Sequence, residues 1–168
     1  MSKYSFFTGS MLLIAVTILQ STLLGKIAIN GVIPDFALII LVFTANSSGP
    51  LKGQTMGFLA GLTRDLISTS PPGFYSLIET LIGFIFGKIR GKLFLDSILL
   101  PVIFVMVATL FRELFSVILS LVFMSESALD FFGKSFLIEL GLNAFFSPFI
   151  FALIKLLKLY NTGYKDGY

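Results

Sequence analysis

Apolar residues in this chain form six long runs, which are separated by short polar or turn-forming segments. A helix that crosses a bilayer needs about 20 mainly apolar residues, because the hydrocarbon core is about 30 Å thick and each residue rises 1.5 Å. The pattern therefore predicts an all-α integral membrane bundle of about six transmembrane helices, with residues 1–168 as one polytopic domain. The predicted spans are residues 6–24, 32–47, 51–67, 74–87, 94–124 and 136–159.

Turn-forming residues mark the ends of several of these runs. Pro34 and Asp35 open the second run, where a proline fits the first helical turn and an acid complements the helix dipole. The dipeptide Gly49-Pro50 separates the second and third runs, and residues 68–73 (STSPPG) separate the third and fourth. The first run has no small-residue cleavage pattern after it, which favours a retained helix over a signal peptide.

The composition supports a membrane protein and removes several kinds of chemistry. Hydrophobic residues make up 56% of the chain and charged residues only 12%, against about 45–50% and 25% in ordinary soluble domains. The chain has no Cys, His or Trp, which excludes disulfides, Cys/His zinc sites and imidazole- or thiol-based catalysis. No phosphate-binding or metal-binding motif is present. We therefore expect no enzymatic activity, no cofactor and no catalytic, cofactor-binding or metal-binding residues.

The basic residues are distributed unevenly between the two sides of the predicted bundle. Six spans place both termini on the same side, and Lys and Arg favour cytoplasmic segments. Two basic residues, Lys26 and Lys134, fall in loops on the far side, and two more lie within spans. Eight fall in segments on the side of the termini, namely Lys3, Lys52, Lys88, Arg90, Lys92, Lys155, Lys158 and Lys165. Both termini are therefore predicted to be cytoplasmic, and these separated positions do not form the basic patch of a nucleic-acid-binding protein.

Ionisable residues also occur inside the predicted spans, where each costs about 2.5–3.5 kcal/mol on insertion scales. Two arrangements would reduce this cost. One is an intramembrane polar network, for example with Arg64 paired to Glu79 and Arg112 paired to Glu139. The other is an acidic outer region that receives a polar partner helix or a cationic solute. The residues concerned are Arg64, Asp65, Glu79, Arg112, Glu113 and Glu139.

Two pairs of glycines have the spacing that allows helix backbones to approach closely. They are Gly57 with Gly61 in the third span, and Gly83 with Gly87 in the fourth. Internal packing of the bundle is the favoured explanation. The alternative is that such a face docks another protein or a second copy of the chain, which would make a homodimer.

A series of short motifs runs from the second to the fourth span, and its order resembles that of the MreD family of bacterial rod shape-determining proteins. In this order an apolar helix begins at Pro34-Asp35-Phe36, and Arg64 stands before the motif aspartate, where an apolar residue would be more usual. The fifth and sixth spans carry no motif of the family. The remaining motif residues are Gly49-Pro50-Leu51, Gly53, Gly57-Phe58, Gly61-Leu62, Asp65-Leu66, Ser70-Pro71-Pro72-Gly73, Gly83-Phe84 and Gly87.

This resemblance implies a scaffold of the cell-elongation machinery in the bacterial cytoplasmic (inner) membrane. Its implied partners are MreC, the MreB cytoskeleton, RodA, penicillin-binding proteins and membrane lipids. We expect partner contact through Pro34, Asp35, Gly57, Gly61 and Asp65, with Arg112 and Glu113 as a second choice.

The family is also similar in size and span number to the S components of energy-coupling-factor transporters, so a fold of that type is implied. The alternative function is therefore a substrate-binding S component of a vitamin transporter. The first span lacks the pair of small residues that would dock a transporter partner, which favours the MreD-like function.

Overall fold

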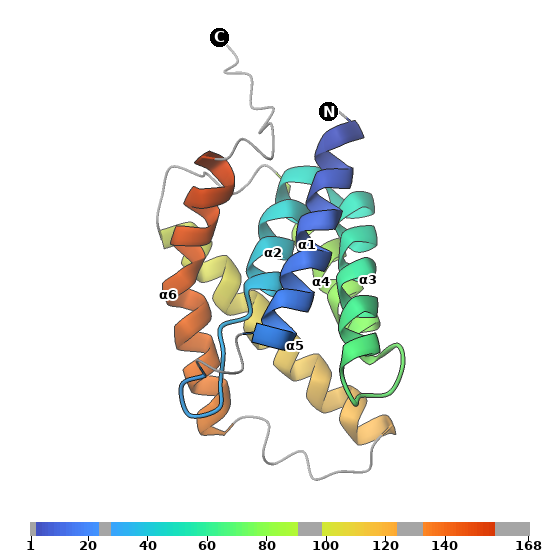
Figure 1. Ribbon diagram of the computed structural model, residues 1–168, viewed down its shortest axis with the longest axis vertical. Coiled ribbons are helices and arrows are strands. Elements are labelled where there is room, and N and C mark those ends of the chain that lie inside the picture. The colour runs from blue at the N-terminus through green and yellow to red at the C-terminus, as the bar shows by residue number, and fades with distance from the viewer. Residues whose placement is uncertain (1–2, 24–27, 91–98, 124–132, 157–168) are drawn as a thin grey trace.

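The computed structural model describes residues 3–23, 28–90, 99–123 and 133–156, and this part of the chain contains six helices (Figure 1). The all-helical fold predicted from the sequence is confirmed for these residues. Consecutive helices run in opposite directions, so α1 begins and α6 ends at the same end of the bundle. The helices are α1 (Lys3–Leu23), α2 (Phe36–Ser48), α3 (Pro50–Ile67), α4 (Phe74–Lys88), α5 (Leu99–Phe123) and α6 (Lys134–Leu156).

The helices begin and end within a few residues of the predicted spans, and the difference at the start of α2 has a local cause. Residues 32–47 were predicted as one span, but α2 begins only at Phe36. Before it, Ile29 and Val32 exchange two backbone hydrogen bonds of 2.9 Å around a tight turn. The turn residues Asn30 and Gly31 both have positive φ, at 51° and 80°, as such two-residue turns require. Predicted span residues 24, 94–98, 124 and 157–159 lie outside the described residues.

The short helix α2 is the centre of the bundle. It contacts each of the other five helices, and 11 of its 13 residues are buried. A helix that is surrounded by protein is apolar on all sides rather than on one face, as α2 is. Its 13 residues span only about 20 Å. Its first turn therefore lies inside the bundle, well above the lower ends of α5 and α6 in Figure 1.

Glycines bring the backbones of α3 and α4 into direct contact. A Cβ atom on Gly57 would lie 2.0 Å from the carbonyl oxygen of Glu79, and one on Gly53 would lie 2.3 Å from that of Gly83. Gly61 is equally close to the start of α4. These distances are far below van der Waals contact, so no larger residue fits. The glycine pairs therefore serve internal packing in this structure.

The other helices form two groups on either side of α2. One group contains α1, α3 and α4, and the other contains α5 and α6. In the described part of the chain, α5 packs against α2 and α4, α6 packs against α2, and neither packs against α1 or α3. Aromatic contacts join the second group to α2 and to the first group. Phe151 of α6 contacts Phe43 of α2 with ring centroids 5.0 Å apart, and Phe104 of α5 contacts Phe86 of α4 with ring centroids 5.8 Å apart.

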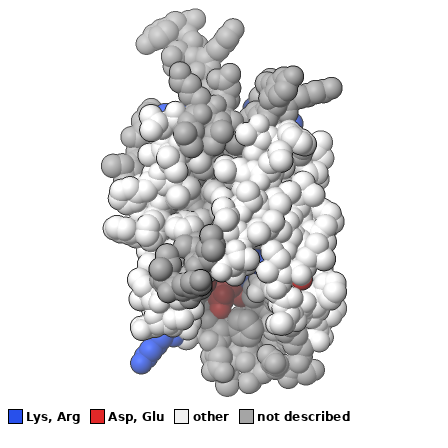
Figure 2. Space-filling view, in the orientation of Figure 1, with Lys and Arg blue, Asp and Glu red and all other residues white. Residues whose placement is uncertain are grey.

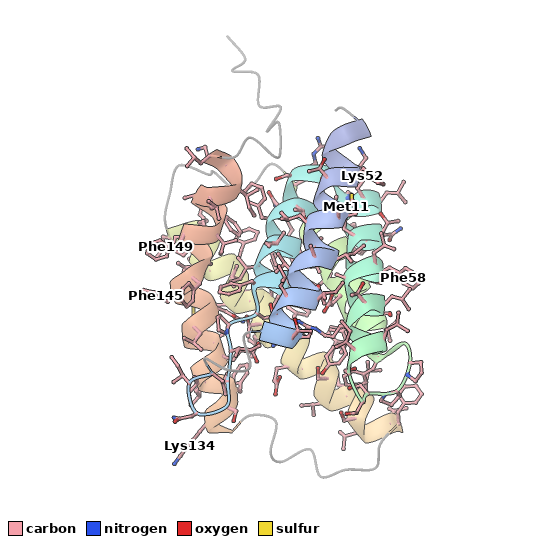
Figure 3. The ribbon with its side chains drawn as sticks, in the orientation of Figure 1. Met11, Lys52, Phe58, Lys134, Phe145 and Phe149 are labelled. Carbon is pink, nitrogen blue, oxygen red and sulfur yellow. The ribbon has the colours of Figure 1, made fainter. Side chains whose placement is uncertain are left out.

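The outer surface of the second group is strongly apolar. Among the described residues, α5 and α6 are each long and apolar enough to cross a membrane, and the apolar parts of α1 and α2 are shorter. Phe145 and Phe149 of α6 point away from the bundle, as does Phe58 of α3 (Figure 3), and all three are about half exposed or more. Such an exterior is typical of a surface that contacts lipid or another apolar partner.

Replacement of Gly57 by Leu is expected to push α3 and α4 apart, because the added Cβ would overlap the backbone of Glu79. We expect a loss of about 3 kcal/mol or more in the free energy of unfolding, measured by thermal unfolding of the purified protein in detergent. Gly141→Leu is the matched control, since nothing lies within 4 Å of a Cβ on Gly141. Equal stability of the two variants would contradict the close contact of α3 and α4.

Candidate functional site

Polar groups of the bundle converge on the carboxylate of Asp35, the N-cap residue of α2. Its Oδ1 atom accepts hydrogen bonds from the backbone N–H of Leu38 (3.0 Å) and from Nε2 of Gln20 (3.1 Å). Its Oδ2 atom accepts from Arg64 (2.7 Å) and from Arg112. Asp35 is only 3% exposed. One buried carboxylate thus caps α2 and binds side chains from α1, α3 and α5.

Each of the two arginines is shared between two carboxylates. Arg64 lies 3.1 Å from Glu79 of α4 in addition to its contact with Asp35. Arg112 contacts Glu139 of α6 in addition to Asp35. The structure therefore contains both pairs that we expected from the sequence, Arg64 with Glu79 and Arg112 with Glu139. Three carboxylates share two guanidinium groups, which leaves one excess negative charge if all five are ionised.

Neutral polar side chains complete the connections. Asn143 of α6 accepts a 2.7 Å hydrogen bond from the backbone N–H of Asp35 and donates to Thr109 of α5 (3.1 Å). Gln20 accepts from the backbone N–H of Ala37 (3.2 Å). The N–H groups at the start of α2, which have no partner within the helix, are thereby hydrogen-bonded to side chains inside the bundle. We call this set the Asp35 network; it comprises Gln20, Asp35, Arg64, Glu79, Thr109, Arg112, Glu139 and Asn143, and every helix contributes to it.

The Asp35 network lies in the half of the bundle that contains the turn between α3 and α4. Arg64 is three residues from the end of α3, and Gln20 is three residues from the described end of α1. Figure 2 agrees with this position: the face shown is mostly uncharged, and the acidic atoms visible on it lie in its lower half. The charged groups are therefore gathered at one depth instead of being spread along the helices.

Asp65, which follows Arg64, has a separate role in the same region. Its carboxylate accepts hydrogen bonds from the backbone N–H groups of Tyr75 (2.8 Å), Ser76 (3.0 Å) and Gly73 (3.1 Å), and from the Ser76 hydroxyl (2.5 Å). The N-cap residue of α4 is Gly73, which has no side chain to cap the helix. Asp65 therefore caps α4 from the neighbouring helix α3.

The residues predicted to contact a partner lie within the bundle. Asp35 and Asp65 are buried and bind groups of the same chain, Gly57 and Gly61 face α4, and Pro34 is partly buried beside Asp35. The structure brings Asp35 into the ion-pair network, although the sequence suggested it only as a contact residue. Direct contact of these five residues with a partner stays a prediction.

Sequence reasoning missed three members of the network: Gln20, Thr109 and Asn143. Gln20 and Asn143 carried a usable signal, because each is the single carboxamide in a mostly apolar helix. A buried carboxamide needs hydrogen-bond partners, so both pointed to a polar contact inside the bundle. Glu113, by contrast, was predicted to join the network but takes no part in the ion pairs of the described residues.

In the Asp35 network, the carboxylates of Asp35, Glu79 and Glu139 are bound by the guanidinium groups of Arg64 and Arg112. Within the described ranges, no group of three or more His, Cys, Asp or Glu side chains is arranged to hold a metal ion. What the arrangement does chemically is to fix charges: each guanidinium offers several donors in a rigid plane, so it can bind two carboxylates at once. Its evident effect is to position the six helices relative to one another.

Comparison with known proteins gives one match. A family model, the rod shape-determining protein MreD, matches residues 2–157 of the chain, which is nearly all of it. No curated protein and no solved structure matches the chain.

Replacement of Asp35 by Ala is expected to destabilise the bundle strongly, because both arginines lose a partner and α2 loses its cap. Breaking a buried ion pair by removing one member costs about 3–5 kcal/mol. Thermal unfolding in detergent measures the effect. Glu113→Ala is the control, since it removes a carboxylate from the same region without breaking an ion pair. If both variants unfold at the same temperature, the Asp35 network does not hold the helices together.

Replacement of Asp65 by Ala is expected to loosen the first turn of α4. Loss of a helix cap costs about 1–2 kcal/mol. The backbone N–H groups of Tyr75 and Ser76 should therefore exchange with deuterium faster than in the unmodified protein. Thr69→Ala is the control, because Thr69 is exposed in the same connection. Unchanged exchange in the Asp65 variant would show that α4 does not depend on this cap.

Proposed function

Because the chain belongs to the MreD family of rod shape-determining proteins, we propose that it is a non-enzymatic scaffold of the bacterial cell-elongation machinery. In this role it binds MreC and couples the MreB cytoskeleton to peptidoglycan synthesis by RodA and penicillin-binding proteins. The family match over nearly the whole chain is the observation that carries the proposal. The family is one of structural shape-determining proteins, and the two long apolar helices indicate a membrane protein.

The proposed scaffold crosses the membrane as a single six-span bundle. The lengths of α5 and α6 are those that a membrane span requires. The shortness of α2 is compatible with it, because α2 is covered by the other helices and its first turn is capped inside the protein. Non-helical backbone at membrane depth is tolerated where protein surrounds it, and the segment that leads into α2 meets this condition through the bond from Asp35 to Asn143.

The distribution of basic residues supports a cytoplasmic location for both termini. Lys52 lies in the first turn of α3, and Lys88, Arg90 and Lys155 lie at the ends of α4 and α6, so all four are at the end of the bundle where α1 begins. Lys134 lies at the opposite end, as Figure 3 shows for Lys52 and Lys134. The positive-inside rule assigns the first end to the cytoplasm. We therefore propose the cytoplasmic membrane as the location.

The Asp35 network is the structural property that suits this scaffold. A protein that couples filaments on one side of a membrane to synthesis on the other must hold its helices in fixed relative positions. Six helices that share one hydrogen-bonded network meet that need, because no helix can shift without breaking contacts to the others. Pro34, Asp35, Gly57, Gly61 and Asp65 then influence partner binding by setting the shape of the bundle.

Purification of the tagged protein from its native membrane in mild detergent tests the proposal. We expect mass spectrometry to recover MreC, enriched at least tenfold over a tagged multi-span protein of the same membrane, without a stoichiometric small molecule. Recovery of transporter ATPase subunits or a bound vitamin would instead support the S-component function and overturn the scaffold.

A further inference from the structure

Glu113 is a carboxylate in the middle of the apolar helix α5. It lies ten residues before Phe123, which is about 15 Å along the helix. Because α5 is tilted in Figure 1 and Glu113 follows Arg112, Glu113 lies inside the proposed span at about the depth of the Asp35 network. The side chain is partly exposed on the outside of the bundle.

Glu113 forms no ion pair among the described residues. The adjacent Arg112 contacts Asp35 and Glu139, and Arg64 contacts Asp35 and Glu79. The Asp35 network already has one excess carboxylate, so a fourth acid cannot be compensated within it. An ionised acid inside a span costs about 2.5–3.5 kcal/mol, and such residues in membrane proteins usually pair with another group. A partner helix can supply the cation that the Asp35 network does not.

The surface around Glu113 is otherwise apolar. Met106, Leu110, Glu113 and Val117 follow one another at intervals of four, three and four residues, which places them on one face of α5. Met106 and Leu110 are 38% and 48% exposed. We call these four residues the Glu113 face. It has the composition of a helix-packing surface with one charged position.

We propose that the Glu113 face docks a transmembrane helix of a partner protein, and that this helix carries a lysine or arginine at the depth of Glu113. Charge complementarity identifies the occupant: the face offers apolar contact and one uncompensated negative charge. Lipid tails provide no donor for the carboxylate. A second copy in a symmetric dimer would place two Glu113 carboxylates against each other. The inference rests on the membrane-embedded arrangement of the proposed function but not on the identity of any partner.

The test uses the full-length protein in lipid vesicles with two synthetic helical peptides, one of polyleucine and one with a single lysine placed at the depth of Glu113. Fluorescence energy transfer between labelled protein and labelled peptide measures association. We expect the lysine peptide to bind at least tenfold more tightly than polyleucine, and Glu113→Gln to remove this difference. Glu113→Lys should reverse the preference and favour a peptide with a glutamate at the same depth, which shows that the variants remain folded.

Photo-crosslinking then locates the contact. A photoreactive residue is placed at Met106, or at Val107 as the matched control. These two positions are 38% and 41% exposed, lie at the same depth, and point about 100° apart around the helix. The lysine peptide should crosslink several-fold more from Met106 than from Val107.

Two results would overturn the proposal. Equal binding of the lysine and polyleucine peptides would mean that the face is a lipid-facing surface. Energy transfer between two copies of the protein that depends on Glu113 would mean that the face is a homodimer contact. Neither result depends on MreC, which is absent from the assay, so failure here is distinguishable from failure to recover MreC from native membranes.

Discussion

The sharing of one carboxylate, that of Asp35, between two guanidinium groups is the interaction on which the rest of the structure depends. Arg64 belongs to the group formed by α1, α3 and α4, and Arg112 belongs to the group formed by α5 and α6. Since the second group packs against neither α1 nor α3, Asp35 links α3 to α5, two helices that do not otherwise pack against each other. Buried charges are tolerated only when they are paired and hydrogen-bonded, and here each supports the others.

The central position of α2 follows from the same interaction. A helix of 13 residues is too short to reach both ends of the bundle, so its first turn must find acceptors for its N–H groups inside the protein. Asp35, Gln20 and Asn143 supply these acceptors. The glycine contacts of α3 and α4 complement this arrangement, because two helices whose backbones touch form a compact wall against which α2 packs.

Local pattern was sufficient to predict the helices, but not how they meet. The apolar runs and the turns at Gly49-Pro50 and residues 68–73 located all six helices to within a few residues. The pairs of Arg64 with Glu79 and of Arg112 with Glu139 were also accessible, because each joins consecutive helices. The central role of Asp35 could not be predicted from the sequence, because its hydrogen bond to Asn143 joins residues that are 108 positions apart. Such a contact depends on which helices pack side by side, and the pattern of apolar and polar residues does not specify that packing.

The separation of the charges along the chain also imposes an order on biogenesis. Arg112 is synthesised 77 residues after Asp35, so Asp35, Arg64 and Glu79 all exist before the second guanidinium of the network does. Until then Asp35, Arg64 and Glu79 carry one unbalanced negative charge within the nascent bundle. The last two helices arrive with Arg112 and Glu139 already able to neutralise each other. The final pair of helices can therefore insert with these two charges paired, and Arg112 can then also bind Asp35 at the start of α2.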